Sequence, residues 1–274
     1  MRAAQGPVRA QLKFLADKDS PLLYLPSKGG GDQTGHLGNF ATRTVEIHNA
    51  REELPSTSLD REGFMLTRHN SAVQDFYDDS QLDGIYHGEV AELLKDVTGA
   101  GHVEVFDDTR RSSSRALQRD RGIREPANIV HNDYTTDSGA RRLRDFFADR
   151  PEELQQLGQR RFAIINVWRS IAGTVVDQPL VMCDATTISD EDLVSVERRA
   201  EERTGEIQVA LFNPLQRWYY FPDMRGDEVL LFKTFDSAVD GRTRFTLHSS
   251  FENPGAPGDA PARESLETRC LVFF

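Results

Sequence analysis

The sequence has 274 residues, of which 38% are hydrophobic, and its formal net charge at pH 7 is −11. A chain of this length can bury a sizeable core, and its acidic balance argues against a nucleic-acid partner, which usually meets a basic protein face. It contains no run of 18 apolar residues, so no membrane span is predicted.

The first part of the chain, residues 1–126, is predicted to form an α/β cap with flanking elements. Its expected elements are strands at 41–50 and 102–108 and helices at 71–79 and 87–99. The second helix has Gly99 as a C-cap. The stretch 109–124 is rich in arginine and serine and is predicted to be a loop, whose role stays open.

The second part of the chain, residues 127–274, alternates short apolar runs with turn residues. The runs are 128–135, 161–170, 179–185, 206–213, 217–222, 227–235, 242–250 and 265–274. Helices are expected at 137–158, with Asp137 or Ser138 as its cap, and at 190–203. Many short strands favour a jelly roll, whereas a doubly wound α/β fold needs a helix after nearly every strand.

The predicted fold class is therefore mainly β with flanking helices. A double-stranded β-helix (jelly roll) core at 127–274 would carry the N-terminal α/β extension at 1–126, and the whole chain, 1–274, would form a single domain. Cys183 and Cys270 both lie in apolar segments and are most simply buried thiols in a reducing cytosol. The N-terminus lacks the apolar stretch of a signal peptide, so a cytoplasmic protein is expected.

The segment VHNDYT places His131 and Asp133 two positions apart on an expected strand. Side chains at i and i+2 of a strand share a face, so both can reach one metal ion. Such a pair also occurs by chance, and a hydrogen-bonded pair at a strand end is the alternative. His248, in the run 242–250, adds a third ligand if early and late strands of the jelly roll pair. Two histidines and one carboxylate suit Fe(II) oxygen chemistry, because three positions of an octahedral ion stay free.

Arg263 and Ser265 follow His248 and would share one face of a strand. Together they could hold a carboxylate, because arginine offers two parallel charge-assisted hydrogen bonds and serine adds a hydroxyl. A cosubstrate that chelates iron through an α-keto acid needs such an anchor for its far carboxylate. The alternative is a surface arginine that pairs with Glu264 or Glu267.

Several segments of the chain resemble the CmcJ/AsaB group of hydroxylase/desaturases, which includes a gibberellin desaturase. They are VHNDYT, NVWRS, PLVMCDA, RWYYFPDM, DEVLLFKTFDS and HSSFENPGAPGDAPARESLETRCLVF. The resemblance implies an Fe(II)- and 2-oxoglutarate-dependent oxygenase that consumes O2, with His131, Asp133 and His248 as metal ligands. It also implies that Arg263 and Ser265 hold 2-oxoglutarate.

This interpretation predicts a dioxygenase that hydroxylates or desaturates a small natural-product-type molecule in secondary metabolism. No nucleic acid or membrane is expected as a partner, and the oligomeric state is left open, a homodimer being one option. One alternative is a cupin-type metal-dependent oxidase or isomerase that does not use 2-oxoglutarate. Another is a non-catalytic accessory protein of a biosynthetic pathway.

Other candidate residues lie close to these motifs. Tyr134 directly follows the ligand pair and could orient it or bind the cosubstrate. Trp168 and Tyr219 are candidate walls of the substrate pocket, although large aromatic side chains are more often simply core. Arg169 could bind an acidic substrate or lie on the outer face of its strand. Lys233 is a charge within an apolar run and needs a partner.

Overall fold

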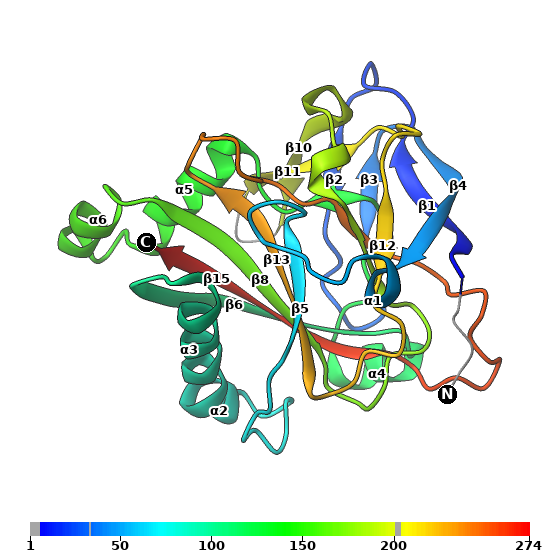
Figure 1. Ribbon diagram of the computed structural model, residues 1–274, viewed down its shortest axis with the longest axis horizontal. Coiled ribbons are helices and arrows are strands. Elements are labelled where there is room, and N and C mark those ends of the chain that lie inside the picture. The colour runs from blue at the N-terminus through cyan, green and yellow to red at the C-terminus, as the bar shows by residue number, and fades with distance from the viewer. Residues whose placement is uncertain (1–5, 33, 201–203) are drawn as a thin grey trace.

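The computed structural model of the chain describes residues 6–32, 34–200 and 204–274. Two β-sheets dominate the fold and helices flank them (Figure 1), so the predicted class, mainly β with a jelly-roll core, is confirmed. Within the described residues, no helix combines the length and apolar character needed to cross a bilayer.

The smaller sheet has five strands, and neighbouring strands run antiparallel. In spatial order they are β5 (Phe64–Arg68), β13 (Glu228–Asp236), β8 (Phe162–Ser170), β15 (Glu264–Phe273) and β6 (His102–Ser112). Helix α3 (His87–Thr98) covers one face, where Val90 and Leu94 pack with Ile165 and Val167 of β8. Burial of these aliphatic side chains holds the helix on the sheet.

The larger sheet has ten strands. In spatial order they are β1 (Val8–Leu15), β4 (Phe40–Asn49), β12 (Trp218–Tyr220), β9 (Leu180–Cys183), β14 (His248–Ser250), β7 (His131–Asn132), β11 (Thr204–Ala210), β10 (Leu193–Arg199), β2 (Leu23–Leu25) and β3 (Gly35–Leu37). The sheet curls back on itself, because Lys13 and Leu15 of the edge strand β1 form bridges to Ile129 and Leu211. Strand β1 therefore lies beside the segment that leads into β7.

The two sheets face each other across a shared apolar layer. Trp168 of β8 and Phe232 of β13 contribute from the smaller sheet, and Met182 and Tyr219 contribute from the larger one. Because side chains alternate along a strand, the other face of β8 packs against α3. Strands from both predicted parts of the chain, before and after residue 126, contribute to both sheets; the single domain stays a prediction.

The observed helices agree only in part with those expected from the sequence. The expected helix 87–99 is α3, and Gly99 adopts the left-handed conformation of a C-cap. The expected helix 137–158 is two helices, α5 (Thr136–Phe146) and α6 (Pro151–Leu157). Thr135, not Asp137 or Ser138, is the N-cap of α5: its hydroxyl accepts from the Ser138 amide in a capping box. Proline at the first position of α6 explains why a new helix starts there.

Two helix predictions and one loop prediction were wrong. Residues 190–203 form a short 3-10 turn (Asp190–Asp192) and strand β10, while 201–203 lie outside the described residues. Segment 71–79 is irregular up to a three-residue α2 (Asp79–Gln81), which continues through a π-helical turn (Leu82–Tyr86) into α3. The predicted loop 109–124 contains the end of β6 and helix α4 (Arg115–Arg121). The remaining short helices are α1 (Ala50–Glu53) and a 3-10 turn (Ala185–Thr187).

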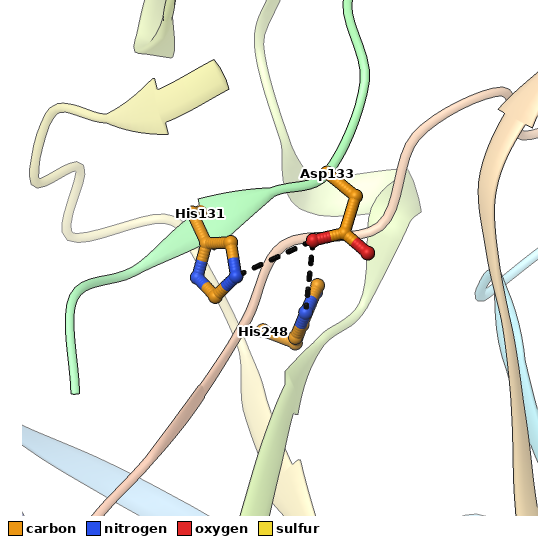
Figure 2. A group of neighbouring side chains, drawn as sticks. All are labelled: His131, Asp133 and His248. Carbon is orange, nitrogen blue, oxygen red and sulfur yellow. Dashed lines mark ion pairs between the residues drawn. The ribbon is translucent and has the colours of Figure 1, made fainter. Parts of the chain in front are cut away.

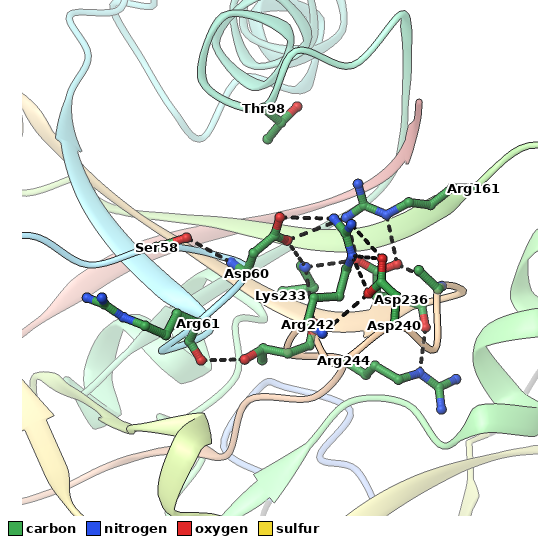
Figure 3. A network of polar contacts seen from close by, with 12 residues as sticks. Ser58, Asp60, Arg61, Thr98, Arg161, Lys233, Asp236, Asp240, Arg242 and Arg244 are labelled. Atoms are coloured by element: carbon green, nitrogen blue, oxygen red, sulfur yellow. Dashed lines mark hydrogen bonds and ion pairs between the residues drawn. The ribbon is translucent and has the colours of Figure 1, made fainter.

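Lys233 has the partners that its position in an apolar strand requires. Its ammonium group lies 2.5 Å from Asp60 Oδ1 and 2.8 Å from Asp236 Oδ2, and it donates to the Thr243 carbonyl at 3.1 Å (Figure 3). Asp236 also binds the guanidinium of Arg161 at 2.6 Å. This network ties β13 to the loop before β5, so the lysine serves the fold.

We expect Lys233→Ala to lower the free energy of unfolding by about 2–4 kcal/mol, because it leaves the buried Asp236 carboxylate with one cation instead of two. Urea unfolding followed by circular dichroism measures the change. Arg242→Ala is the matched control: Arg242 contacts the same Asp60 at 3.0 Å, but it is more exposed (Figure 3), and such pairs contribute little. An equal loss in both variants would contradict the structural role of Lys233.

Candidate metal centre

His131, Asp133 and His248 come together at the point where β7 pairs with β14. His131 and His248 are direct partners in the register of these strands. Figure 2 shows the three side chains converging, and one ligand atom from each lies within 4.8 Å of the others. Oδ1 of Asp133 is 3.5 Å from Nε2 of His131 and 4.0 Å from Nε2 of His248. The structure therefore brings together all three residues that the sequence proposed.

Backbone carbonyls fix both imidazole rings. Nδ1 of His131 lies 2.8 Å from the carbonyl of Ile129, and Nδ1 of His248 lies 3.2 Å from the carbonyl of Thr246. Since a carbonyl only accepts, each Nδ1 carries a proton, and these hydrogen bonds direct Nε2 of each ring toward the centre (Figure 2). Burial, and then the neighbouring His131, lowers the pKa of His248 to about 3. Both Nε2 atoms thus face the centre as metal-binding donors.

The Asp133 carboxylate is oriented by two further side chains. Its Oδ2 accepts from Asn166 Nδ2 at 2.8 Å and from Arg269 Nε at 3.0 Å, which leaves Oδ1 for the histidines. Burial opposes ionisation, but Arg269 and the two histidines hold the pKa of Asp133 well below its usual range. The centre therefore offers two imidazole Nε2 atoms and one carboxylate, a donor set suited to a divalent transition metal.

Arg269 is the functional residue that the sequence reasoning missed. Besides Asp133, it binds Asp107 at 2.6 Å and forms an ion pair with Glu267. A signal was present, because positions 263, 265, 267 and 269 alternate along one strand and so share a face. Arg263, the proposed anchor for the far carboxylate of the cosubstrate, lies just before β15, and Arg269 lies on β15. Both arginines thus reach the same centre.

A small cavity lies on one side of the centre. Its lining includes His131, His248, Trp168, Arg263 and Glu267, and its volume is about 10 Å³. This space admits about one water molecule. The structure thus places Trp168 and Arg263 beside the histidines.

Arg263 is buried without a matching carboxylate. Its Nη1 donates to the carbonyl of Gln178 at 2.6 Å, but its Nε has no partner, and Oγ of Ser265 is also buried and unpaired. Within the described ranges no carboxylate lies within ion-pair distance of this guanidinium. Burial, and then the charge of Arg111, lowers the pKa of Arg263 to about 9. Because unpaired buried charges are costly, these atoms fit an anionic ligand.

A second, larger cavity also reaches the centre and shares Arg111, His131 and Arg269 with the lining of the small one. It has a volume of about 310 Å³ and reaches His131, Asp133 and Tyr134. Tyr134 lines this cavity and not the small one beside Arg263. Burial raises the pKa of Tyr134 to about 12, so the phenol is neutral near pH 7. Tyr134 thus faces the space available to a substrate.

Two candidates from the sequence are not brought to the centre. Arg169 projects from the opposite face of β8 to Trp168, and its guanidinium lies over the rings of Phe76 and Tyr86. Tyr219 packs in the layer between the sheets and lines neither cavity that reaches His131. Neither residue therefore lines a cavity that reaches His131.

Comparisons with known proteins agree with this geometry. A family model described as "Oxidoreductase/YMDC permease-like domain" matches residues 12–273. The chain is 35% identical to the hydroxylase/desaturase CTB9 of Cercospora beticola, over 91% of this chain and 84% of the relative. It is also 35% identical to the Fe(II)/2-oxoglutarate-dependent dioxygenase nvfI of Aspergillus novofumigatus, over 88% of this chain and 87% of the relative.

A solved structure of similar shape is the iron and alpha-ketoglutarate-dependent endoperoxidase NvfI. It superposes with a TM-score of 0.84 at 31% identity, and the match covers 98% of both chains. The two-sheet core and its N-terminal strands are thus shared over nearly the whole length.

Proposed function

The chain belongs to the family of Fe(II)/2-oxoglutarate-dependent dioxygenases that includes hydroxylase/desaturases, and on that premise we propose that His131, Asp133 and His248 bind its Fe(II). The orientation of Nε2 on both rings and of Oδ1 on Asp133 supports this assignment. Once bound, Fe(II) and 2-oxoglutarate supply the O2 chemistry that hydroxylates or desaturates a small molecule of natural-product type. The protein fixes the donor set and limits access of water.

Arg263 and Ser265 would bind the far carboxylate of 2-oxoglutarate. The observation that most strongly supports this is the unpaired, buried Nε of Arg263 beside the two histidines. A carboxylate there could accept from Nε and from the Ser265 hydroxyl. The free space of about 10 Å³ is too small for the whole diacid, so side chains such as Trp168 or Glu267 must shift when it binds.

The alternative without 2-oxoglutarate fits less well. A cupin-type oxidase or isomerase would need no anion beside the metal, and the buried Nε of Arg263 would then stay without a hydrogen-bond partner. An accessory protein would not need the oriented set of metal donors. The same arrangement thus favours the dioxygenase over both alternatives.

The substrate would occupy the larger cavity, whose volume of about 310 Å³ suits a small molecule. Tyr134 would contact the substrate there, and Trp168 would form part of the wall of the smaller cavity, beside the cosubstrate. We place the enzyme in the cytoplasm, because Cys183 and Cys270 are both free and buried.

Anaerobic titration of the purified protein with Fe(II) and then 2-oxoglutarate tests this proposal. We expect one Fe(II) per chain, followed by the visible charge-transfer band of the chelate, and slow release of succinate once O2 is admitted. Iron binding without the band and without succinate would favour the oxidase or isomerase. Absence of stoichiometric iron binding would contradict the enzyme assignment altogether.

A further inference from the structure

The larger cavity is rich in arginine, although the chain as a whole is acidic. Its charged lining groups are Arg111, Arg124, Arg142, Arg198, Arg269, Asp107, Asp133 and Glu206. Cations thus outnumber anions around a cavity in a protein of net charge −11, and a bound Fe(II) would add two further positive charges. Such an excess attracts an anionic ligand.

Three of these arginines have other contacts. Arg269 holds Asp133 and Asp107, as described above. Arg142 lies over the ring of Phe106, with 4.3 Å between its guanidinium carbon and the ring centre. Arg111 donates to the carbonyl of Glu125 at 2.8 Å. Each of these three arginines thus has a partner within the protein and needs no ligand to explain its position.

The acidic residues of the cavity are also occupied. Asp107 binds Arg269, and Glu206 accepts from Arg141 at 3.3 Å and from Thr135 at 3.2 Å. Asp133 belongs to the metal centre. No lining carboxylate therefore remains for a further cation.

Arg124 and Arg198 are the arginines of the cavity without such a contact. Among the residues that the structure describes, neither has a carboxylate within ion-pair distance. The backbone of Arg124 bridges to that of Arg111, and Arg198 is paired with Tyr24 between β10 and β2, so both are held on ordered backbone. Burial lowers the pKa of each guanidinium, and for Arg124 the nearby Arg111 and Arg198 lower it further. Two half-buried cations that line one cavity without a paired carboxylate are unfavourable unless a ligand pairs with them.

We propose that the substrate is an organic acid whose carboxylate is bound by Arg124 and Arg198 in the cavity that also reaches His131 and Asp133. This inference rests on the proposed function, because it assigns the chemical class of the molecule that the iron centre oxidises. The cosubstrate does not account for the pair, since Arg263 lines the other cavity. Each guanidinium offers parallel donors that match a carboxylate and discriminate against the uncharged ester.

Calorimetric titration with matched acids and esters tests this inference. The anaerobic enzyme, loaded with Fe(II) and 2-oxoglutarate, is titrated with cinnamate, 1-naphthoate and decanoate, and with the methyl ester of each. We expect acids to bind more tightly than their esters. Arg124→Gln and Arg198→Gln should each weaken acid binding roughly 10- to 100-fold, because each removes a charge-assisted hydrogen bond, and should leave ester binding unchanged.

Arg199→Gln is the matched control. Arg199 neighbours Arg198 in β10, is exposed, and pairs with Glu197 at 2.6 Å. Equal binding of acids and esters, or equal effects of Arg198→Gln and Arg199→Gln, would overturn the inference. The chelate band is recorded in the same samples: a normal band without acid preference refutes only this inference. A missing band with acid binding that still depends on Arg124 and Arg198 refutes only the iron and 2-oxoglutarate assignment.

Discussion

Replacing Asp133 by alanine is expected to weaken Fe(II) binding more than about 100-fold and to abolish substrate oxidation. Side chains that merely orient a metal ligand typically contribute 10–100-fold in metal affinity, and Asp133 would supply a ligand atom itself. His131→Ala and His248→Ala are expected to act alike, because each removes an oriented Nε2 donor. Anaerobic titration with Fe(II) and analysis of bound iron measure the loss.

Asp108→Ala is the control for these ligand variants. Asp108 is also a partly buried, paired aspartate, bound to His87 at 2.6 Å, but it lies on β6 and lines neither cavity beside the centre. We expect this variant to keep one Fe(II) per chain. Circular dichroism checks that all variants fold. Iron binding of wild-type affinity in the Asp133, His131 and His248 variants would disprove the ligand assignment.

Arg263→Ala is expected to weaken 2-oxoglutarate binding about 100-fold or more while Fe(II) binding is kept. The substitution removes the Nε donor together with its positive charge, and a hydrogen bond between charged groups contributes about 1.5–3 kcal/mol. Lysine at this position should not restore affinity, because an ammonium group lacks the planar pair of donors. Ser265→Ala should cost less, since it removes a single neutral hydroxyl. Titration of the chelate band gives the affinities.

The cosubstrate itself provides a sharper comparison. 2-Oxobutyrate has the α-keto acid end but no far carboxylate, so the wild type should prefer 2-oxoglutarate strongly and Arg263→Ala should not. Arg169→Ala is the matched protein control, because Arg169 is an equally buried arginine on the far face of β8. If Arg263→Ala kept the full preference for 2-oxoglutarate, the anchor assignment would be wrong.

The metal centre could be predicted from the sequence because its parts follow local rules. Alternation in an extended segment predicted that His131 and Asp133 lie on one side, which the structure confirms although β7 ends at Asn132, and the strand-like run around His248 supplied the third donor. The same rule predicted that Arg263 and Ser265 share a face; in the structure both are buried and Arg263 lines the small cavity beside the histidines. The contact of Asn166 with Asp133 could not be foreseen, because it depends on how the two sheets face each other.

The errors have a common physical cause. Segment 190–203 contains helix-favouring charged residues, but Val194 and Val196 alternate as in a strand, and pairing with β11 and β2 decided the outcome. Arg169 and Tyr219, candidates for substrate binding, lie outside the linings of both cavities that reach His131, a placement that depends on how the sheets pack. Packing between segments distant in sequence determined these features, which the local sequence pattern could not predict.

The pairing of His131 with His248 also links metal supply to folding. The two histidines are 117 positions apart in the chain (248 minus 131), and bringing them together costs the entropy of closing that long loop. An ion bound by both histidines would cross-link the two ends of this loop, and its binding free energy would add to the free energy of unfolding. If His131 and His248 bind the iron as proposed, iron starvation would enlarge the unfolded fraction of this protein as well as remove its activity, and would expose the chain to degradation.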